Sequence, residues 1–289
     1  MDIRYRSKDG LELYAKSYGA ENAPLTALCM HGLTRNHKDF EPMIDALLAE
    51  GLNVRFIAVD VRGRCNSESD QNVENYTPAV YADDMFTLLD HLGVEKAALI
   101  GTSMGGIMSM FMMSMAPQRI LGVVLNDIGP ELEQAGLDRI SGYVGGNEPK
   151  ENYEAAARAV ADVQKAAFPN YTFDDWLAFA KRTYRERPDG KVELDYDPAI
   201  ARTIGEVKPT PEIKQAMWAL YAQLSAVPLL LVRGDISDLL SAENAERMIT
   251  EHGNGELVTV SQIGHTPLLN EPDVVTALTK HLKSLEPNV

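Results

Sequence analysis

Residues 97–106 read Ala-Ala-Leu-Ile-Gly-Thr-Ser-Met-Gly-Gly, an apolar run that leads into the pentapeptide Gly-x-Ser-x-Gly at 101–105. A methionine-rich segment with helical spacing, 104–115, follows directly. The order strand, sharp turn, helix is the context in which this motif presents a reactive serine. A serine hydroxyl attacks poorly until a base takes its proton, so the turn has to hold Ser103 within reach of one. The stretch therefore predicts Ser103 as a nucleophile at the end of a buried strand.

Segments typical of strands and helices alternate on both sides of this motif. The first two expected strands flank Asp9-Gly10, a strong hairpin signal. The expected strands are 3–7, 11–18, 25–30, 54–59, 97–100, 121–125, 229–232 and 257–260. The expected helices are 39–49, 78–92, 104–115, 153–167, 173–184, 212–224, 242–252 and 274–285. This alternation predicts an α/β fold, with a mostly parallel twisted sheet and helices on both faces.

The alternation stops between residues 131 and 226, where every convincing element is helical. It resumes with the apolar run 229–232. We therefore predict three segments: residues 1–130 as the first part of a core domain, 131–226 as a helical insertion between two late strands, and 227–289 as the second part of the core.

Composition and charge exclude several classes of protein. The net charge of −15 argues against a nucleic-acid-binding surface, which would be basic. No run of 18 or more apolar residues is present, and the start, Met1-Asp2-Ile3-Arg4, is no signal peptide, so we expect a cytoplasmic protein without a membrane partner. The two cysteines, Cys29 and Cys65, fit neither a zinc site nor a redox pair, and no metal is expected.

In a parallel sheet, the loops that follow the strands meet at one edge. Here those loops carry Ser103, the acids Asp127, Asp235 and Asp238, and Gly264-His265. A nucleophile, a carboxylate and a histidine thus converge in the order Ser, Asp, His. Acyl transfer needs this set, together with backbone N–H donors for the oxyanion.

With these motifs, the sequence resembles the α/β-hydrolase superfamily, specifically its cap-bearing branch of esterases, lactonases and carbon–carbon bond hydrolases. The resemblance rests on His31-Gly32, Asp60-Val61-Arg62-Gly63, the elbow at Ser103, the acid loop after 229–232 and Gly264-His265, with a helical insertion where that branch carries its cap. It covers nearly the whole chain.

The resemblance implies a role for each matching position. Ser103 is similar to the family nucleophile and His265 to its base. The N–H groups of Leu33 and Met104 match the oxyanion donors. His31 matches a residue that fixes its loop rather than one that carries a proton.

The position of the acid is open between three aspartates. The family usually places its acid three residues after the glycine that corresponds to Gly234, where this chain has Ser237. Asp238 lies three residues before Ser241, at the start of the next expected helix, and matches the family spacing from that side. We favour Asp238. The alternatives are Asp235, which could cap the turn, and Asp127, whose strand end is an alternative acid position in the superfamily.

Two further positions in the loops carry hypotheses. Arg35, four residues after His31, could pair with a substrate carboxylate, and the competing interpretation is a salt bridge to an acid of the cap or a loop. Cys65 stands where the family often has a second glycine. Either Cys65 adopts the positive φ of that glycine at a cost in strain, or Asn66 takes the unusual conformation.

The expected function is that of a serine hydrolase. A Ser-His-Asp triad would form an acyl-enzyme and cleave a small carboxylic ester, thioester or lactone, without a cofactor and with a small molecule as its partner. One alternative keeps the triad but hydrolyses a carbon–carbon bond of a keto acid from aromatic degradation, which Arg35 motivates. An alternative of another class is a non-catalytic ligand receptor with the hydrolase fold.

Overall fold

The computed structural model describes residues 1–146, 148–204 and 210–286. These residues form an eight-stranded sheet with the order β1-β2-β4-β3-β5-β6-β9-β10. Only β2 runs antiparallel to its neighbours, and the other pairs are parallel. The strands are β1 (Asp2–Arg6), β2 (Glu12–Tyr18), β3 (Leu25–Met30), β4 (Val54–Asp60), β5 (Ala97–Thr102), β6 (Ile120–Asn126), β9 (Leu229–Gly234) and β10 (Gly255–Val260).

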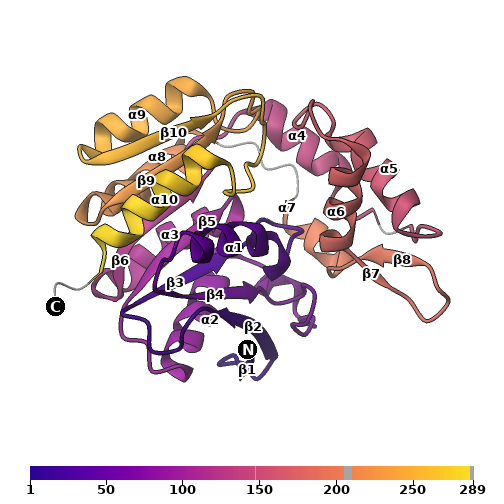
Figure 1. Ribbon diagram of the computed structural model, residues 1–289, viewed down its shortest axis with the longest axis horizontal. Helices are drawn as coiled ribbons and strands as arrows, with labels where there is room; N and C mark the ends of the chain where they lie inside the picture. Colours follow the sequence, from indigo (N-terminus) through magenta and orange to yellow (C-terminus); the bar gives the residue numbers. More distant parts are fainter. Residues whose placement is uncertain (147, 205–209, 287–289) are drawn as a thin grey trace.

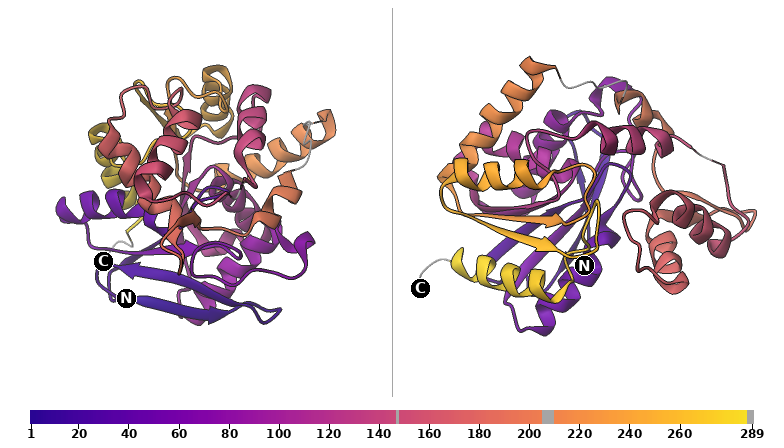
Figure 2. Two further views of the ribbon diagram at one scale, coloured as in Figure 1. Left: turned by 90° about the vertical axis from the view of Figure 1, so that its right-hand side faces the viewer. Right: turned by 90° about the horizontal axis from the view of Figure 1, so that it is seen from above.

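Helices cover both faces of the sheet (Figures 1 and 2). One face packs against α2 (Pro78–His91), α3 (Met104–Met115), α8 (Pro211–Ala222) and α9 (Ala242–His252). The other face packs against α1 (Glu41–Ala49) and α10 (Pro272–Ser284). Strand β3 shows why both faces are apolar: Leu28 and Met30 belong to the first cluster, whereas Ala27 and Cys29 belong to the second. Since successive side chains point to opposite faces, a continuous apolar run is what such a strand requires.

The predicted fold class is confirmed by this architecture. The β1–β2 hairpin turns at Gly10, whose φ is +95°. Helix α2 begins after Thr77, whose side chain accepts a hydrogen bond from the Val80 N–H. Most other predicted elements are present, with ends shifted by a few residues.

The prediction that residues 131–226 are purely helical is wrong. Helices α4 (Gln134–Tyr143), α5 (Tyr153–Gln164), α6 (Phe173–Thr183) and α7 (Ala201–Ile204) are joined there by a two-stranded sheet of β7 (Tyr184–Glu186) and β8 (Val192–Leu194). Three-residue strands are too short to show an alternating pattern in the sequence.

The segment 131–226 also divides in its packing. Helices α5 and α6 and the β7–β8 hairpin share a small hydrophobic cluster of their own around Phe168 and Trp176. They form the lobe at the right of Figure 1, which we call the cap lobe. Helix α8 instead contacts α3, under the sheet. The three-segment division stays a prediction, and its middle segment ends on a helix that packs against the core.

Close backbone contact at the Ser103 turn requires glycine at position 105. A Cβ atom on Gly105 would overlap the backbone carbonyl of Met30 in β3. Replacing Gly105 with alanine should therefore lower the free energy of unfolding by about 3 kcal/mol, because the strand and the helix have to move apart. Chemical denaturation followed by circular dichroism measures this.

Gly142 offers a matched control for that substitution. It lies in helix α4 with open space where a Cβ would be placed. Gly142→Ala should leave stability unchanged or raise it by up to about 1 kcal/mol, since alanine favours helix. Equal denaturation midpoints for the two variants would contradict the close packing described at position 105.

Candidate active site

Ser103 lies at the turn between β5 and α3 in a strained conformation. Its φ and ψ are +52° and −115°, outside the regions that non-glycine residues normally occupy. The backbone holds it there: its N–H donates to the Asn126 carbonyl at 3.0 Å, and its own carbonyl accepts from the Gly106 N–H at 2.9 Å. The sharp turn leaves the hydroxyl half-buried at the carboxyl edge of the sheet.

A continuous chain of hydrogen bonds links Ser103, His265 and Asp127. The Ser103 Oγ lies 2.9 Å from His265 Nε2, and His265 Nδ1 lies 2.8 Å from Asp127 Oδ2. A carboxylate only accepts hydrogen bonds, so the proton of the neutral imidazole is assigned to Nδ1. Nε2 is then free to accept the proton of the Ser103 hydroxyl. The arrangement can therefore activate the Ser103 hydroxyl by removing its proton. Asp127 holds His265 in the orientation that this proton transfer needs.

Asp127 is fixed by its place in the sheet. Thr102 of β5 pairs with Asn126 of β6, so Ser103 and Asp127 are the next residues on adjacent strands. The Asp127 side chain is fully buried. Its Oδ1 accepts from the Gly234 N–H at 3.0 Å, and its Oδ2 also accepts from the Ser237 hydroxyl at 2.6 Å. These donors compensate the negative charge for the loss of water.

Asp238, the acid favoured by loop spacing, has Arg139 as its partner, whereas His265 Nδ1 lies 2.8 Å from Asp127. Its carboxylate binds the Arg139 guanidinium of α4 at 2.5 and 2.7 Å. The Asp238 carbonyl also accepts from the Gly136 N–H of the same helix. Burial raises the pKa of Asp238, but the hydrogen bonds and charge of Arg139 outweigh it and hold the pKa low. The longer loop thus turns Asp238 toward α4 rather than toward His265.

The third candidate acid, Asp235, has a local role. Its N–H donates to the Val260 carbonyl, and its side chain accepts from Ser261 at 3.4 Å, as expected for a residue that caps a turn. Ser237 occupies the position where the family usually has its acid, and it hydrogen-bonds Asp127 instead. The serine at that position is a feature of the sequence that favours an acid from another strand.

The two predicted oxyanion donors flank Ser103. Met104 is the first residue of α3, where helix N–H groups have no partner within the helix. Leu33 lies in the loop after β3. Within the described ranges, neither N–H has a protein acceptor. Both are therefore available to an oxygen bound next to the nucleophile.

His31 fixes the loop that carries Leu33. Its ring is fully buried, accepts from the Val61 N–H at 3.1 Å through Nε2, and lies 2.6 Å from the Gly32 carbonyl through Nδ1. Burial, together with the nearby Arg64 charge, lowers the pKa of His31 to about 4. A ring that stays neutral and has both nitrogens occupied matches the structural role implied by the sequence.

The Arg35 guanidinium is bound by side chains of the protein itself. The stem lies against Gly32, close to Ser103, but the guanidinium binds Asp39 at 2.5 and 2.6 Å. It also donates to Thr183 of the cap lobe at 2.6 Å and stacks 3.9 Å from the Phe179 ring. The competing interpretation, a salt bridge within a loop, describes this residue, which also ties the loop after β3 to the cap lobe.

Cys65, rather than Asn66, has a positive φ, at +48°. Together with His37 and Asp60 it forms a group whose donor atoms lie within 4.8 Å of one another, a spacing that a metal ion could use. The Asp60 carboxylate, however, already accepts from the N–H and the ring of His37 and from Asn66. These bonds give the group a structural role in holding two loops together.

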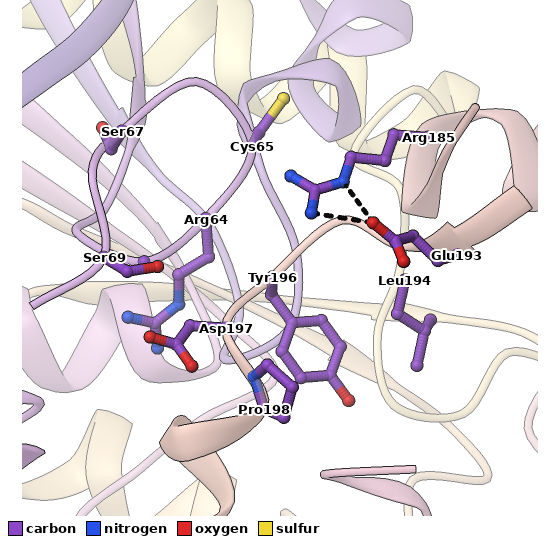
Figure 3. A pocket seen from close by; sticks show the side chains of 11 residues that line it. Arg64, Cys65, Ser67, Ser69, Arg185, Glu193, Leu194, Tyr196, Asp197 and Pro198 are labelled. Atoms are coloured by element: carbon purple, nitrogen blue, oxygen red, sulfur yellow. Dashed lines mark hydrogen bonds and ion pairs between the residues drawn. The ribbon is translucent and has the colours of Figure 1, made fainter. Parts of the chain in front are cut away.

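A polar cavity of about 240 Å³ lies between the loop of residues 63–69 and the cap lobe (Figure 3). On its far side, Arg185 and Glu193 form an ion pair at 2.9 Å. The lining residues are Gly63, Arg64, Cys65, Ser67, Ser69, Arg185, Glu193, Leu194, Tyr196, Asp197 and Pro198.

Among the described residues, no helix combines the length and apolar character needed to cross a membrane.

Comparison with known proteins places the chain in a family. Residues 28–272 match the family model described as alpha/beta hydrolase fold. The 3-hydroxybutyrate-oligomer hydrolase of Cupriavidus necator is 31% identical over 262 residues, which cover 88% of this chain and 87% of that protein. The crystal structure of an alpha/beta hydrolase from Novosphingobium aromaticivorans has a TM-score of 0.89 and 38% identity, with 98% of both chains covered.

A third similar protein carries out a named reaction. The structure of E-2-(acetamidomethylene)succinate hydrolase has a TM-score of 0.78 and 26% identity, and the match covers 98% of this chain and 100% of that one. The chain therefore belongs to the α/β-hydrolase family and is an enzyme.

Proposed function

We propose that this enzyme is a serine hydrolase that cleaves a small carboxylic ester, with Ser103 as nucleophile, His265 as base and Asp127 as the acid that orients it. The observation that carries the proposal is the hydrogen-bonded chain from Ser103 through His265 to Asp127. Its order, tautomer and burial match what acyl transfer by serine requires.

The reaction follows from these contacts in two steps. Ser103 Oγ attacks the ester carbonyl carbon while its proton passes to His265 Nε2, and the N–H groups of Leu33 and Met104 bind the oxyanion. When the tetrahedral intermediate collapses, the C–O bond to the alcohol breaks and the alcohol leaves with the proton from His265. Water then attacks the acyl-enzyme, again giving a proton to His265, and the carboxylic acid departs as Ser103 recovers its proton.

The named relatives support an ester as substrate. The Cupriavidus necator protein hydrolyses 3-hydroxybutyrate oligomers according to its name, and their units are joined by ester bonds. We therefore favour oxyesters of short hydroxy acids. Carbon–carbon bond hydrolysis loses its motivation because Arg35 is bound to Asp39. A complete hydrogen-bonded triad also disfavours a non-catalytic receptor.

Labelling with a fluorophosphonate tests the proposal. The reagent should attach one phosphonyl group to Ser103, identified by mass spectrometry of the peptide that contains residues 97–106. Hydrolysis of p-nitrophenyl butyrate should fall in proportion to the labelled fraction, because the same oxygen performs both reactions. A label on another serine, or full hydrolysis by fully labelled protein, would sink the assignment.

A further inference from the structure

Two arginines of the loop after β4 are buried but differ in their partners. Arg62 binds the carboxylates of Asp9, Asp70 and Asp84. Arg64 is fully buried, and in residues 1–146, 148–204 and 210–286 its guanidinium has no ion-pair partner. A buried charge without a direct ion pair is costly, so the position of Arg64 requires an explanation.

Arg64 contacts both residues whose N–H groups are the predicted oxyanion donors. Its Nε donates to the Leu33 carbonyl at 3.0 Å, and its Nη2 lies 3.6 Å from Met104 Sδ. Its Nη1 donates to the Arg62 carbonyl at 2.7 Å and to the Tyr81 hydroxyl at 3.0 Å. The planar Arg64 guanidinium thus connects the loop that carries Leu33 with the side chain of the first residue of α3.

We propose that Arg64 is a positioning residue for the oxyanion site, which holds the Leu33 and Met104 N–H groups in place and supplies positive charge behind them. This inference rests on the proposed function, because it presumes an oxyanion at Ser103. Asp197 lines the same cavity as Arg64 (Figure 3). Its carboxylate accepts from the Tyr76 hydroxyl at 2.6 Å and from the Ala199 N–H at 2.8 Å.

The physical reason is that charge acts strongly where water is excluded. Donors already aimed at a developing negative charge need no reorganisation during the reaction. A guanidinium in a low-dielectric interior strengthens the positive electrostatic potential of these N–H donors. Its hydrogen bond to the Leu33 carbonyl fixes the loop so that the Leu33 N–H faces the oxyanion. The low pKa of His31, due first to burial and then to Arg64, indicates that this charge reaches the same loop.

The test compares Arg64→Met, which removes the charge, with Arg64→Lys, which keeps the charge but loses the planar guanidinium. Arg64→Met should lower kcat for p-nitrophenyl butyrate roughly 30-fold with KM unchanged, somewhat less than the loss of an oxyanion donor itself. Arg64→Lys should lie between this variant and the wild type. Tyr81→Phe, which removes one acceptor of the guanidinium, should stay within threefold of the wild type.

A transition-state mimic separates positioning from general stability. A trifluoromethyl ketone adds to the serine and places an oxyanion in the site, so its inhibition constant should rise in Arg64→Met by the same factor as kcat falls. A purely structural role would lower the melting temperature without this parallel. Unchanged kcat and inhibition constant in Arg64→Met would overturn the inference, and so would equal losses in Arg64→Lys and Arg64→Met.

The inference and the proposed function can fail separately. If the fluorophosphonate does not label Ser103, the proposed function fails before any Arg64 variant is made. If Ser103 is labelled and the ketone inhibits the wild type, but Arg64→Met behaves like the wild type, only the role of Arg64 is wrong. If Arg64→Met does not fold, the comparison of Arg64→Lys with the wild type and Tyr81→Phe decides, and kcat and inhibition constant both unchanged in Arg64→Lys would overturn the role.

Discussion

Asp127→Asn should lower kcat for a p-nitrophenyl ester about 10⁴-fold, the size of loss known when a serine protease loses its triad carboxylate to an amide. The amide nitrogen would donate toward His265 Nδ1, which lies 2.8 Å from the Asp127 carboxylate. The imidazole would then carry its proton on Nε2 and could not accept the proton of Ser103. Steady-state kinetics measure the effect, and circular dichroism checks that the variant is folded.

Asp238→Asn is the matched control for this substitution. It also neutralises one aspartate, but it affects the pair with Arg139 and leaves the hydrogen bonds of His265 in place. We expect a loss in kcat of less than about tenfold, since the Asp238 carboxylate binds Arg139 while His265 keeps its hydrogen bond to Asp127. The reverse outcome, with a severe loss only in Asp238→Asn, would restore the acid favoured by loop spacing.

Ser103→Gly should abolish ester hydrolysis and at the same time stabilise the protein relative to Ser103→Ala. Both variants lose the oxygen that attacks the ester. In each of them kcat should fall about 10⁶-fold, as in serine proteases without their nucleophile. Only glycine relieves the backbone strain at φ +52° and ψ −115°. Since glycine also loses more chain entropy on folding, the net gain over alanine should be about 1 kcal/mol.

Urea denaturation of the two variants measures this difference. Alanine is the control, because it removes the same oxygen but keeps a Cβ atom. A glycine variant less stable than the alanine variant would contradict stored strain at the turn. Hydrolysis within tenfold of the wild type in either variant would contradict the role of Ser103 as nucleophile.

The sequence was sufficient for the elements that carry a strong local pattern. Runs such as 25–30 and 97–100 are apolar because both faces of the sheet are covered. This pattern can be recognised in the sequence without the tertiary structure. Ser103 and His265 follow from short motifs on loops at one edge of the sheet, and the structure brings these two residues together.

The acid and the role of Arg35 depend on contacts between distant segments. Spacing along the 234–241 loop could not reveal that Arg139, about a hundred residues earlier, binds Asp238. Nor could it show that Asp39 and Thr183 occupy the Arg35 guanidinium. The β7–β8 hairpin of the cap lobe was missed because each strand is three residues long.

The pairing of Thr102 with Asn126 has a consequence for how this enzyme can diversify. Ser103 and Asp127 directly follow the paired residues Thr102 and Asn126, and paired strands lie about 4.8 Å apart in a sheet. With Asp127 as the proposed acid, the loop after β9 does not have to carry the carboxylate, and it contacts Asp127 through the Ser237 hydroxyl. Substitutions at the exposed Ile236 of this loop should therefore leave the distance between the proposed nucleophile and acid unchanged.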